Sequence, residues 1–320
     1  MALFKRAYLL FLASALALPE TSCIFDDLEP CEDANIGFSI TNNWGTDTSA
    51  DPEGMAYLFF YDSGCEPWRF DFPGKEAGRI SLPEGSYSFI MFNDDTASID
   101  FVSDENEHIF ATTKNVTIGF DPHIGELRAS PDMMWADASI LVKLDPNCLE
   151  YTTSEYAKKI DLIHNADMNM ITNPQQIVAR YTLLINHIEN LSGVACMKGL
   201  LSGMSSGINL NTNTHSEKAV SIPFDLSVAA DSAVCSEFLT FGLPGSPASE
   251  PNDILLFFKL SDGNIIKYDF DKTEEIRNAS DPLNVKLTID SIHLPYAPPI
   301  EGNSGFAPSV SGWTTVIVNY

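Results

Sequence analysis

Basic residues are scarce in this 320-residue chain, in which 18 lysines and arginines stand against 44 aspartates and glutamates. The formal net charge is -26 at pH 7. Proteins that bind nucleic acid use a basic face to neutralise phosphates, and so few basic residues cannot supply one. Nucleic acid is therefore excluded as a partner. Hydrophobic residues make up 44% of the chain, which is too many for a disordered acidic protein.

Long apolar runs are also missing, apart from one at residues 7–18. A membrane-spanning helix needs about 20 apolar residues, so this run is too short to be a permanent span. Lys5 and Arg6 precede it, and the small residues Thr21 and Ser22 follow it. This order of basic, apolar and small residues predicts a signal peptide over residues 1–22.

Cys23 directly follows these small residues, as in bacterial lipoproteins whose first mature residue is an acylated cysteine. We therefore predict lipidation at Cys23. Each buried methylene of an acyl chain contributes about 0.8 kcal/mol, so several chains would hold the protein at a membrane surface without a span. The alternative is ordinary secretory cleavage, with Cys23 left as a plain thiol.

Metal-binding patterns are absent from the sequence. The six cysteines form no CxxC pair, and the six histidines show no HxH or HExxH spacing, so neither zinc nor another cofactor is expected. The spacing of the cysteines assigns no disulfide. Acidic residues gather between Asp94 and Glu107, but no twelve-residue calcium loop fits them, and we expect a solvated loop there.

One motif resembles a catalytic one. Residues 203–207 (GMSSG) match the G-x-S-x-G nucleophile elbow, and Asp253 and His293 follow Ser205 in the chain order of a hydrolase triad. That elbow needs a parallel sheet flanked by helices, whereas short strands and turns surround this motif. We expect a glycine-rich strand edge or bulge and predict no catalytic residues.

Short apolar runs separated by turn residues predict an all-β fold, a sandwich or a barrel. The expected strands are residues 38–41, 55–61, 87–92, 116–120, 140–144, 218–228, 254–260, 265–270, 285–289 and 314–320. Asp262 and Gly263 mark the turn of the clearest hairpin. Residues 155–165 favour a short helix. Residues 177–191 fit a helical stripe slightly better than the alternation of a strand, and both readings stay open here.

The order of several short motifs resembles the fimbrillin-like lipoproteins of the Bacteroidales, including lipid-anchored accessory subunits of type V pili. The opening of the mature chain, at residues 23–31 (CIFDDLEPC), is similar to theirs. The other landmarks are residues 80–87 (ISLPEGSY), Asn93, 130–137 (SPDMMWAD), 200–207 (LLSGMSSG) and 309–313 (SVSGW). The resemblance covers nearly the whole mature chain.

This resemblance implies two tandem transthyretin-like β-sandwich domains with minor helix, over residues 23–148 and 149–320, and no enzyme activity. It favours a strand over residues 179–188. Polymerising members lose their first strand to a protease that cuts after arginine or lysine, and the groove then accepts a strand from the next subunit. Here no lysine or arginine lies between Arg6 and Arg69, so we expect the first strand to stay.

We therefore expect a non-catalytic lipoprotein on the outer face of the outer membrane that acts as a fimbrial anchor or adhesin-like subunit. Its expected partners are fimbrial subunits, bound by β-strand addition, or ligands on host or bacterial surfaces. The alternative is a glycan-binding surface lipoprotein, in which tryptophan and tyrosine rings stack on sugars.

Overall fold

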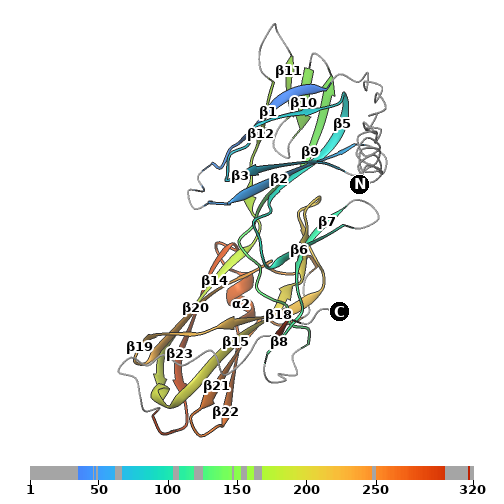
Figure 1. The fold of residues 1–320 in the computed structure, drawn as a ribbon. Helices are drawn as coiled ribbons and strands as arrows, with labels where there is room; N and C mark the ends of the chain where they lie inside the picture. Colours follow the sequence, from blue (N-terminus) through green and yellow to red (C-terminus); the bar gives the residue numbers. More distant parts are fainter. Residues whose placement is uncertain are drawn as a thin grey trace, which may run out of the picture. The chain divides into compact units, whose positions relative to one another are not determined.

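A computed structural model describes residues 35–299, except 46, 48–49, 62–66, 104–107, 119–124, 146–147, 153–156, 162–167 and 247–249, together with residues 316–317 (Figure 1). The predicted signal peptide and Cys23 lie outside these ranges.

The described chain is mostly β-strand with almost no helix, which confirms the predicted all-β fold with minor helix. In the first half the strands are β1 (Ile36–Asn42), β2 (Gly54–Tyr61), β3 (Trp68–Pro73), β4 (Arg79–Leu82), β5 (Gly85–Asn93), β6 (Ile99–Ser103), β7 (Ile109–Thr113), β8 (Val116–Thr117), β9 (Trp135–Asp145), β10 (Cys148–Thr152), β11 (Ala157–Asp161), β12 (Asn169–Thr172) and β13 (Gln175–Gln176).

In the second half they are β14 (Ala179–Glu189), β15 (Val194–Ser205), β16 (Gly207–Asn209), β17 (Thr214–His215), β18 (Ala219–Asp225), β19 (Ser227–Ala230), β20 (Ala233–Thr240), β21 (Asp253–Leu260), β22 (Ile265–Asp271), β23 (Asn284–His293) and β24 (Val316–Ile317). The helical turns there are η1 (Leu191–Gly193) and α2 (Thr273–Arg277).

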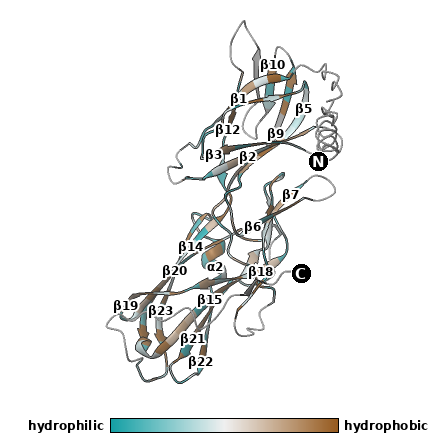
Figure 2. Cartoon of the chain, viewed as in Figure 1, coloured by the Kyte–Doolittle hydropathy of each residue, from teal (hydrophilic) through white to brown (hydrophobic). Residues whose placement is uncertain are grey.

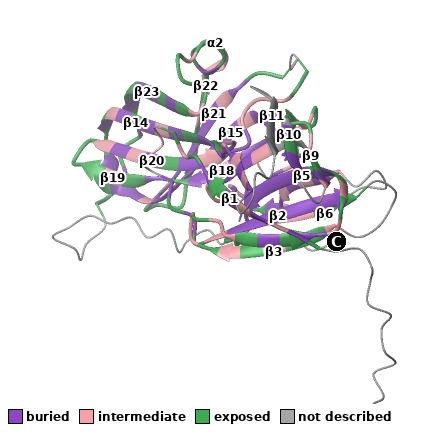
Figure 3. Ribbon diagram, turned by 90° about the horizontal axis from the view of Figure 1, so that it is seen from above, coloured by how far each residue is buried: buried purple, intermediate pink, exposed green. Residues whose placement is uncertain are grey.

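The first sandwich packs a three-stranded sheet, in the order β12-β1-β4, against a larger sheet in the order β11-β10-β9-β5-β2-β3. Its core combines Phe38 and Leu82 of the small sheet with Tyr57 and Phe89 of the large one, and all four are 3% exposed or less. Figure 3 shows that the central strands β2 and β5 are mostly buried, whereas the edge strand β3 is largely exposed.

The second sandwich packs a sheet in the order β19-β20-β14-β23 against one in the order β18-β15-β21-β22. Its core takes alternate residues of each strand, such as Tyr181, Leu183 and Ile185 on β14, which are 1% exposed or less. In Figure 2, brown hydrophobic and teal hydrophilic residues both occur along the strands of this sandwich. A period of two is what a half-buried strand needs.

A third sheet, in the order β17-β16-β7-β6, pairs strands from both halves of the sequence. Phe110 of β7 lies opposite Asn209 of β16 in this sheet. A separate core cluster contains Phe60 and Phe92 from the first half, and Ile208 and Phe241 from the second. The two halves are therefore joined by main-chain pairing and by buried side chains.

Residues 125–131, here called the strap, run beside β18 in the second half. The backbone N–H of Arg128 donates to the Ser221 carbonyl over 3.0 Å, and the Ser221 N–H donates to the Glu126 carbonyl over 2.9 Å. Arg128 also contacts the Glu126 carboxylate over 2.7 Å, and Lys218 of the second half forms an ion pair with the same carboxylate. The strap therefore covers part of the β18 edge.

Most strand predictions are confirmed, including the hairpin of β21 and β22. The short helix predicted over residues 155–165 is wrong where the structure describes it, because Ala157–Asp161 form β11 and pair with β10. Residues 179–189 form strand β14, so the helical stripe was the wrong reading and the resemblance gave the right one. Both errors come from short segments in which apolar spacing fits both periods.

Strand pairing continues the first sandwich beyond residue 148. Strand β10 pairs with β9, β11 pairs with β10, and β12 pairs with β1, so these strands after residue 148 belong to the first two sheets. Of the predicted C-terminal strand, the structure describes only Val316 and Ile317, which pair with Thr117 and Val116 of β8.

Candidate functional site

The first described strand fills a central position in its sheet. Strand β1 runs parallel to β12 and antiparallel to β4, with Ile36, Phe38 and Ile40 buried in the core. The Phe38 ring is fully buried and meets the Phe59 ring edge-on, with centroids 6.1 Å apart. The position between β12 and β4 is therefore occupied by a strand of the same chain.

A buried polar network holds the end of β1. The Asn42 amide donates to the Tyr57 hydroxyl over 2.7 Å and to the Lys75 carbonyl over 2.8 Å, and the Thr172 hydroxyl donates to the Asn42 oxygen over 2.7 Å. Burial raises the pKa of Tyr57 to about 12, so its hydroxyl stays neutral. Removing β1 would leave the Tyr57 and Thr172 hydroxyls without the partner that Asn42 provides, which is costly in a core.

Ser205, Asp253 and His293 do not form a catalytic triad. The Ser205 side chain is fully buried, and its hydroxyl lies 2.7 Å from the Gly207 carbonyl and 3.1 Å from the Ser216 carbonyl. His293 pairs instead with Glu189, at 3.0 Å. The Asp253 backbone N–H donates to the Ser202 hydroxyl over 2.8 Å. Each group is thus part of the strand structure.

The glycine motif forms a bulge in β15, as the sequence predicted. Its register against β18 shifts between Leu201 and Met204, and Gly203 has a φ of 71°. The Asn252 amide fills the space beside the bulge and donates to the Gly203 carbonyl over 3.0 Å. A glycine is needed here because a Cβ would lie 2.6 Å from that amide nitrogen.

The acidic residues near β5 act as local hydrogen-bond acceptors. Asp95 accepts from the Glu53 backbone N–H over 2.6 Å and from the Asn93 amide over 2.7 Å, while Asp94 pairs with Arg69 at 2.5 Å. Residues 104–107 of the predicted cluster lie outside the described ranges. Within those ranges, no three histidine, cysteine or acidic side chains are grouped as metal ligands would be.

Three of the cysteines, Cys148, Cys196 and Cys235, lie in described positions, and Cys196 and Cys235 are free thiols. Burial raises the pKa of the Cys196 thiol. The candidate lipidation site Cys23 lies outside the described residues, as do Cys31 and Cys65. Over the ranges that are described, no helix has the length and apolar character to cross a membrane.

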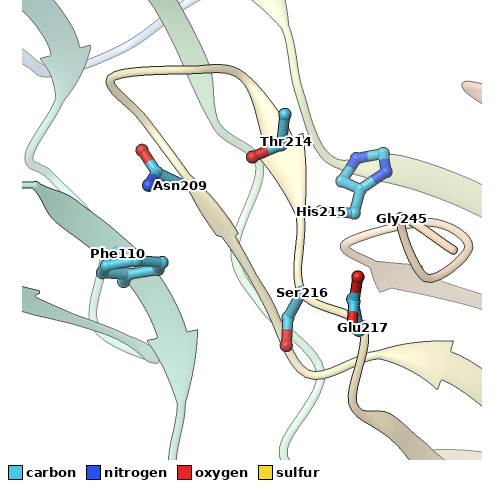
Figure 4. Close-up of a pocket in the computed structure, with 7 residues that line it drawn as sticks. All are labelled: Phe110, Asn209, Thr214, His215, Ser216, Glu217 and Gly245. Atoms are coloured by element: carbon cyan, nitrogen blue, oxygen red, sulfur yellow. The ribbon is translucent and has the colours of Figure 1, made fainter.

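A pocket of about 480 Å³ lies beside the third sheet (Figure 4). It is lined by Phe110, Asn209, Thr214, His215, Ser216, Glu217 and Gly245. Sequence reasoning missed it because its residues come from three separated segments. The run of asparagine and threonine at residues 211–214 is a local turn signal, but nothing in it shows that Phe110 lies opposite Asn209.

These observations define a class first: an all-β protein of two sandwiches joined by a shared sheet. The family is then given by residues 22–225, which match the family described as "Domain of unknown function (DUF5119)". The chain belongs to that family.

Two similar proteins come from Bacteroides ovatus. A Bacteroides ovatus protein described as "Putative fimbrium anchoring subunit Fim4B" is 24% identical over 342 residues, which cover 97% of this chain and 96% of that protein. A crystal structure described as "a putative adhesin from Bacteroides ovatus" has a TM-score of 0.56 and 18% identity, over 82% of this chain and 94% of that one. That similarity supports the sandwich fold.

The structure of "the fimbrial anchor protein Mfa2 from Porphyromonas gingivalis" is more distant. Its TM-score is 0.44 and its identity is 13%, over 79% of this chain and 90% of that one.

Proposed function

We propose that this protein is a lipid-anchored fimbrial anchor or adhesin-like subunit at the outer surface of the outer membrane, and that it has no enzyme activity. The observation that carries the proposal is the similarity, over 97% of the chain, to the protein described as "Putative fimbrium anchoring subunit Fim4B". The predicted lipidation at Cys23 adds the tether, because several acyl chains hold a protein firmly at a membrane surface.

The first strand supports an anchoring rather than a polymerising role. Buried Phe38 and the hydrogen bonds of Asn42 fix β1 in its sheet. No lysine or arginine lies between Arg6 and Arg69, so a protease that cuts after basic residues has no site between the predicted signal peptide and the end of β1. A subunit that keeps this strand also keeps its N-terminal tether.

Its partners in this proposal are fimbrial subunits, which attach by adding a strand to an exposed edge or by pairing with the chain end at residues 314–320. The described part of that end, Val316–Ile317, has only two residues paired with β8. We also propose two sandwich domains, with the boundary after β13 rather than at residue 148.

The tether is tested by Cys23→Ala in the native host, followed by membrane fractionation and a count of cell-bound and shed fibres. We expect the variant to be exported but to leave the membrane fraction, with fibres released into the medium. Cys31→Ala is the matched control, since it removes the other cysteine of the predicted mature N-terminal segment and leaves Cys23 intact.

Retention of Cys23→Ala in the membrane fraction would overturn the lipid tether. The anchoring role itself fails if cells lacking this protein keep as many fibres on their surface as cells that have it. Mass spectrometry of the native protein should give a mature N-terminus at Cys23, with β1 still present.

A further inference from the structure

The third sheet has one face in a core and one face towards solvent. Ile109, Ala111 and Ile208 point into the core that joins the two halves. On the opposite face the register forms a row across four strands, from Val102 through Phe110 and Asn209 to Thr214. Directly opposed residues share a face, so these side chains are neighbours.

Asn209 carries an unused donor in this row. The residue is only 8% exposed, and its Oδ1 accepts from the backbone N–H groups of Asn211 over 2.9 Å and Thr212 over 3.2 Å. Its amide nitrogen has no hydrogen-bond partner among the residues that the structure describes. The amide nitrogen is not among the buried polar atoms that lack a partner, so it faces solvent and is free to donate to water or to a ligand.

The other groups of the pocket suit a ligand that is partly apolar and rich in hydroxyls. The half-exposed Phe110 ring offers an apolar face next to Asn209. Glu217 accepts from the Ser246 hydroxyl through one carboxylate oxygen, at 2.8 Å, and the Thr214 hydroxyl lies 2.7 Å from that of Thr212. Of the residues drawn in Figure 4, Phe110 belongs to β7, Asn209 to β16 and Thr214 to β17, and Ser216 and Glu217 follow β17.

The charge of the pocket disfavours anions. The described residues that line it include no lysine or arginine, and Glu217 brings a negative charge. Burial lowers the pKa of His215, against a weaker opposing effect of a backbone hydrogen bond to Leu243, so the imidazole is neutral at pH 7. Phosphate, sulfate and carboxylate ligands would lack the cationic partner they need.

From this geometry we propose that the pocket between β7, β16 and β17 binds a neutral carbohydrate. One sugar ring packs its C–H face on Phe110, while its hydroxyls accept from the Asn209 amide and donate to Glu217. A volume of about 480 Å³ lies in the range of ligand pockets and accommodates one or two sugar rings. The site is independent of the proposed anchoring role and would give the subunit a ligand of its own.

The test uses the full mature chain and the methyl glycosides of glucose, galactose, mannose and N-acetylglucosamine, with lactose and cellobiose as disaccharide probes. Saturation-transfer NMR and calorimetry measure binding. We expect at least one neutral sugar to bind, and the anionic sugar N-acetylneuraminic acid not to bind.

Asn209→Asp is the sharpest variant, because it keeps the oxygen that accepts at the turn and replaces the amide donor by a charged acceptor oxygen. We expect it to weaken binding about tenfold or more, and Phe110→Leu to weaken it similarly. Trp68→Ala is the matched control: this ring is 46% exposed on β3, outside the pocket, and its loss should leave binding unchanged.

Thermal unfolding of each variant shows whether the fold is kept. The site is refuted if none of these sugars binds at millimolar concentration, or if binding survives both Asn209→Asp and Phe110→Leu. Binding that depends on Trp68 instead would move the sugar to β3 and equally refute the pocket. None of these outcomes changes the fibre count that tests anchoring.

Discussion

Single positions in the GMSSG segment show how local geometry replaces an apparent catalytic motif. Gly203 combines a φ of 71° with a position where a Cβ would lie 2.6 Å from the Asn252 amide nitrogen and 2.7 Å from the Pro251 carbonyl oxygen. We expect Gly203→Ala to lower the free energy of unfolding by more than the 1–2 kcal/mol or so that backbone strain alone costs. Urea denaturation measures the difference.

Gly263 provides the matched control for this prediction. Its φ is 89°, but nothing lies within 4 Å of the Cβ that alanine would add. Gly263→Ala should therefore show the strain alone, about 1–2 kcal/mol. Equal losses at both positions would show that close contact with Asn252 contributes nothing at Gly203.

The sequence allowed the nature of this motif to be predicted, but not its contacts. Short strands and turn residues around Ser205 were enough to reject a nucleophile elbow in favour of a bulge. The sequence does not reveal that Asn252 hydrogen-bonds to the bulge, because the two segments meet only through the pairing of β15 with β21. The pocket beside Asn209 was missed for the same reason.

Among the strands, β1 is the one whose loss should matter most for the first sandwich. Phe38 is fully buried and packs on Phe59. Phe38→Ala should lower the free energy of unfolding by about 3–5 kcal/mol, because it removes a large ring and leaves a cavity. Chemical denaturation monitored by fluorescence measures this loss.

Leu184 on β14 serves as the control, since it is 39% exposed. Leu184→Ala should change the free energy of unfolding by less than about 1 kcal/mol, because little apolar area is uncovered. A comparable loss from the two variants would contradict the central role of β1 in its core.

The strap should make stability depend on pH through Glu126. Burial pushes the pKa of this carboxyl up, but hydrogen bonds and charges from Lys218 and Arg128 outweigh burial, and the net pKa lies below the ordinary 4.5. The unfolded chain then binds the proton more readily, so the stabilisation is complete above about pH 4.5 and is lost as the pH falls below it.

Glu126→Gln should therefore lower the free energy of unfolding by about 1–2 kcal/mol at pH 7 and flatten its decline in acid. Glu237→Gln is the control, because Glu237 and Arg180 form an exposed pair at 3.0 Å, worth about 0.5 kcal/mol or less. If the free energy of unfolding depends on pH in the same way for both variants between pH 7 and pH 3, Glu126 is not the source of the acid sensitivity.

Strand positions were more predictable than strand partners. Alternation and turn residues located most strands, including the hairpin of β21 and β22, because each signal is local. The helix expected over residues 155–165 failed because apolar residues spaced three or four apart also occur in a short strand such as β11. Pairing of β7 with β16, about a hundred positions later, had no local signal.

Over the full chain, the shared sheet and its core predict that both sandwiches unfold together. Phe92 of the first half is 2% exposed in the same cluster as Phe241 of the second. We expect one calorimetric transition for the protein. Phe92→Ala should weaken the coupling and split this into two. Two separate transitions in the unmodified protein would show that the halves are energetically independent.

In the proposed anchoring role, the place of β1 between β12 and β4 also bears on the polarity of a fibre. A subunit that keeps β1 offers no vacancy in this sheet for a strand from another subunit. Under that proposal the anchor has a single growing end, and every filament started on it would point away from the cell.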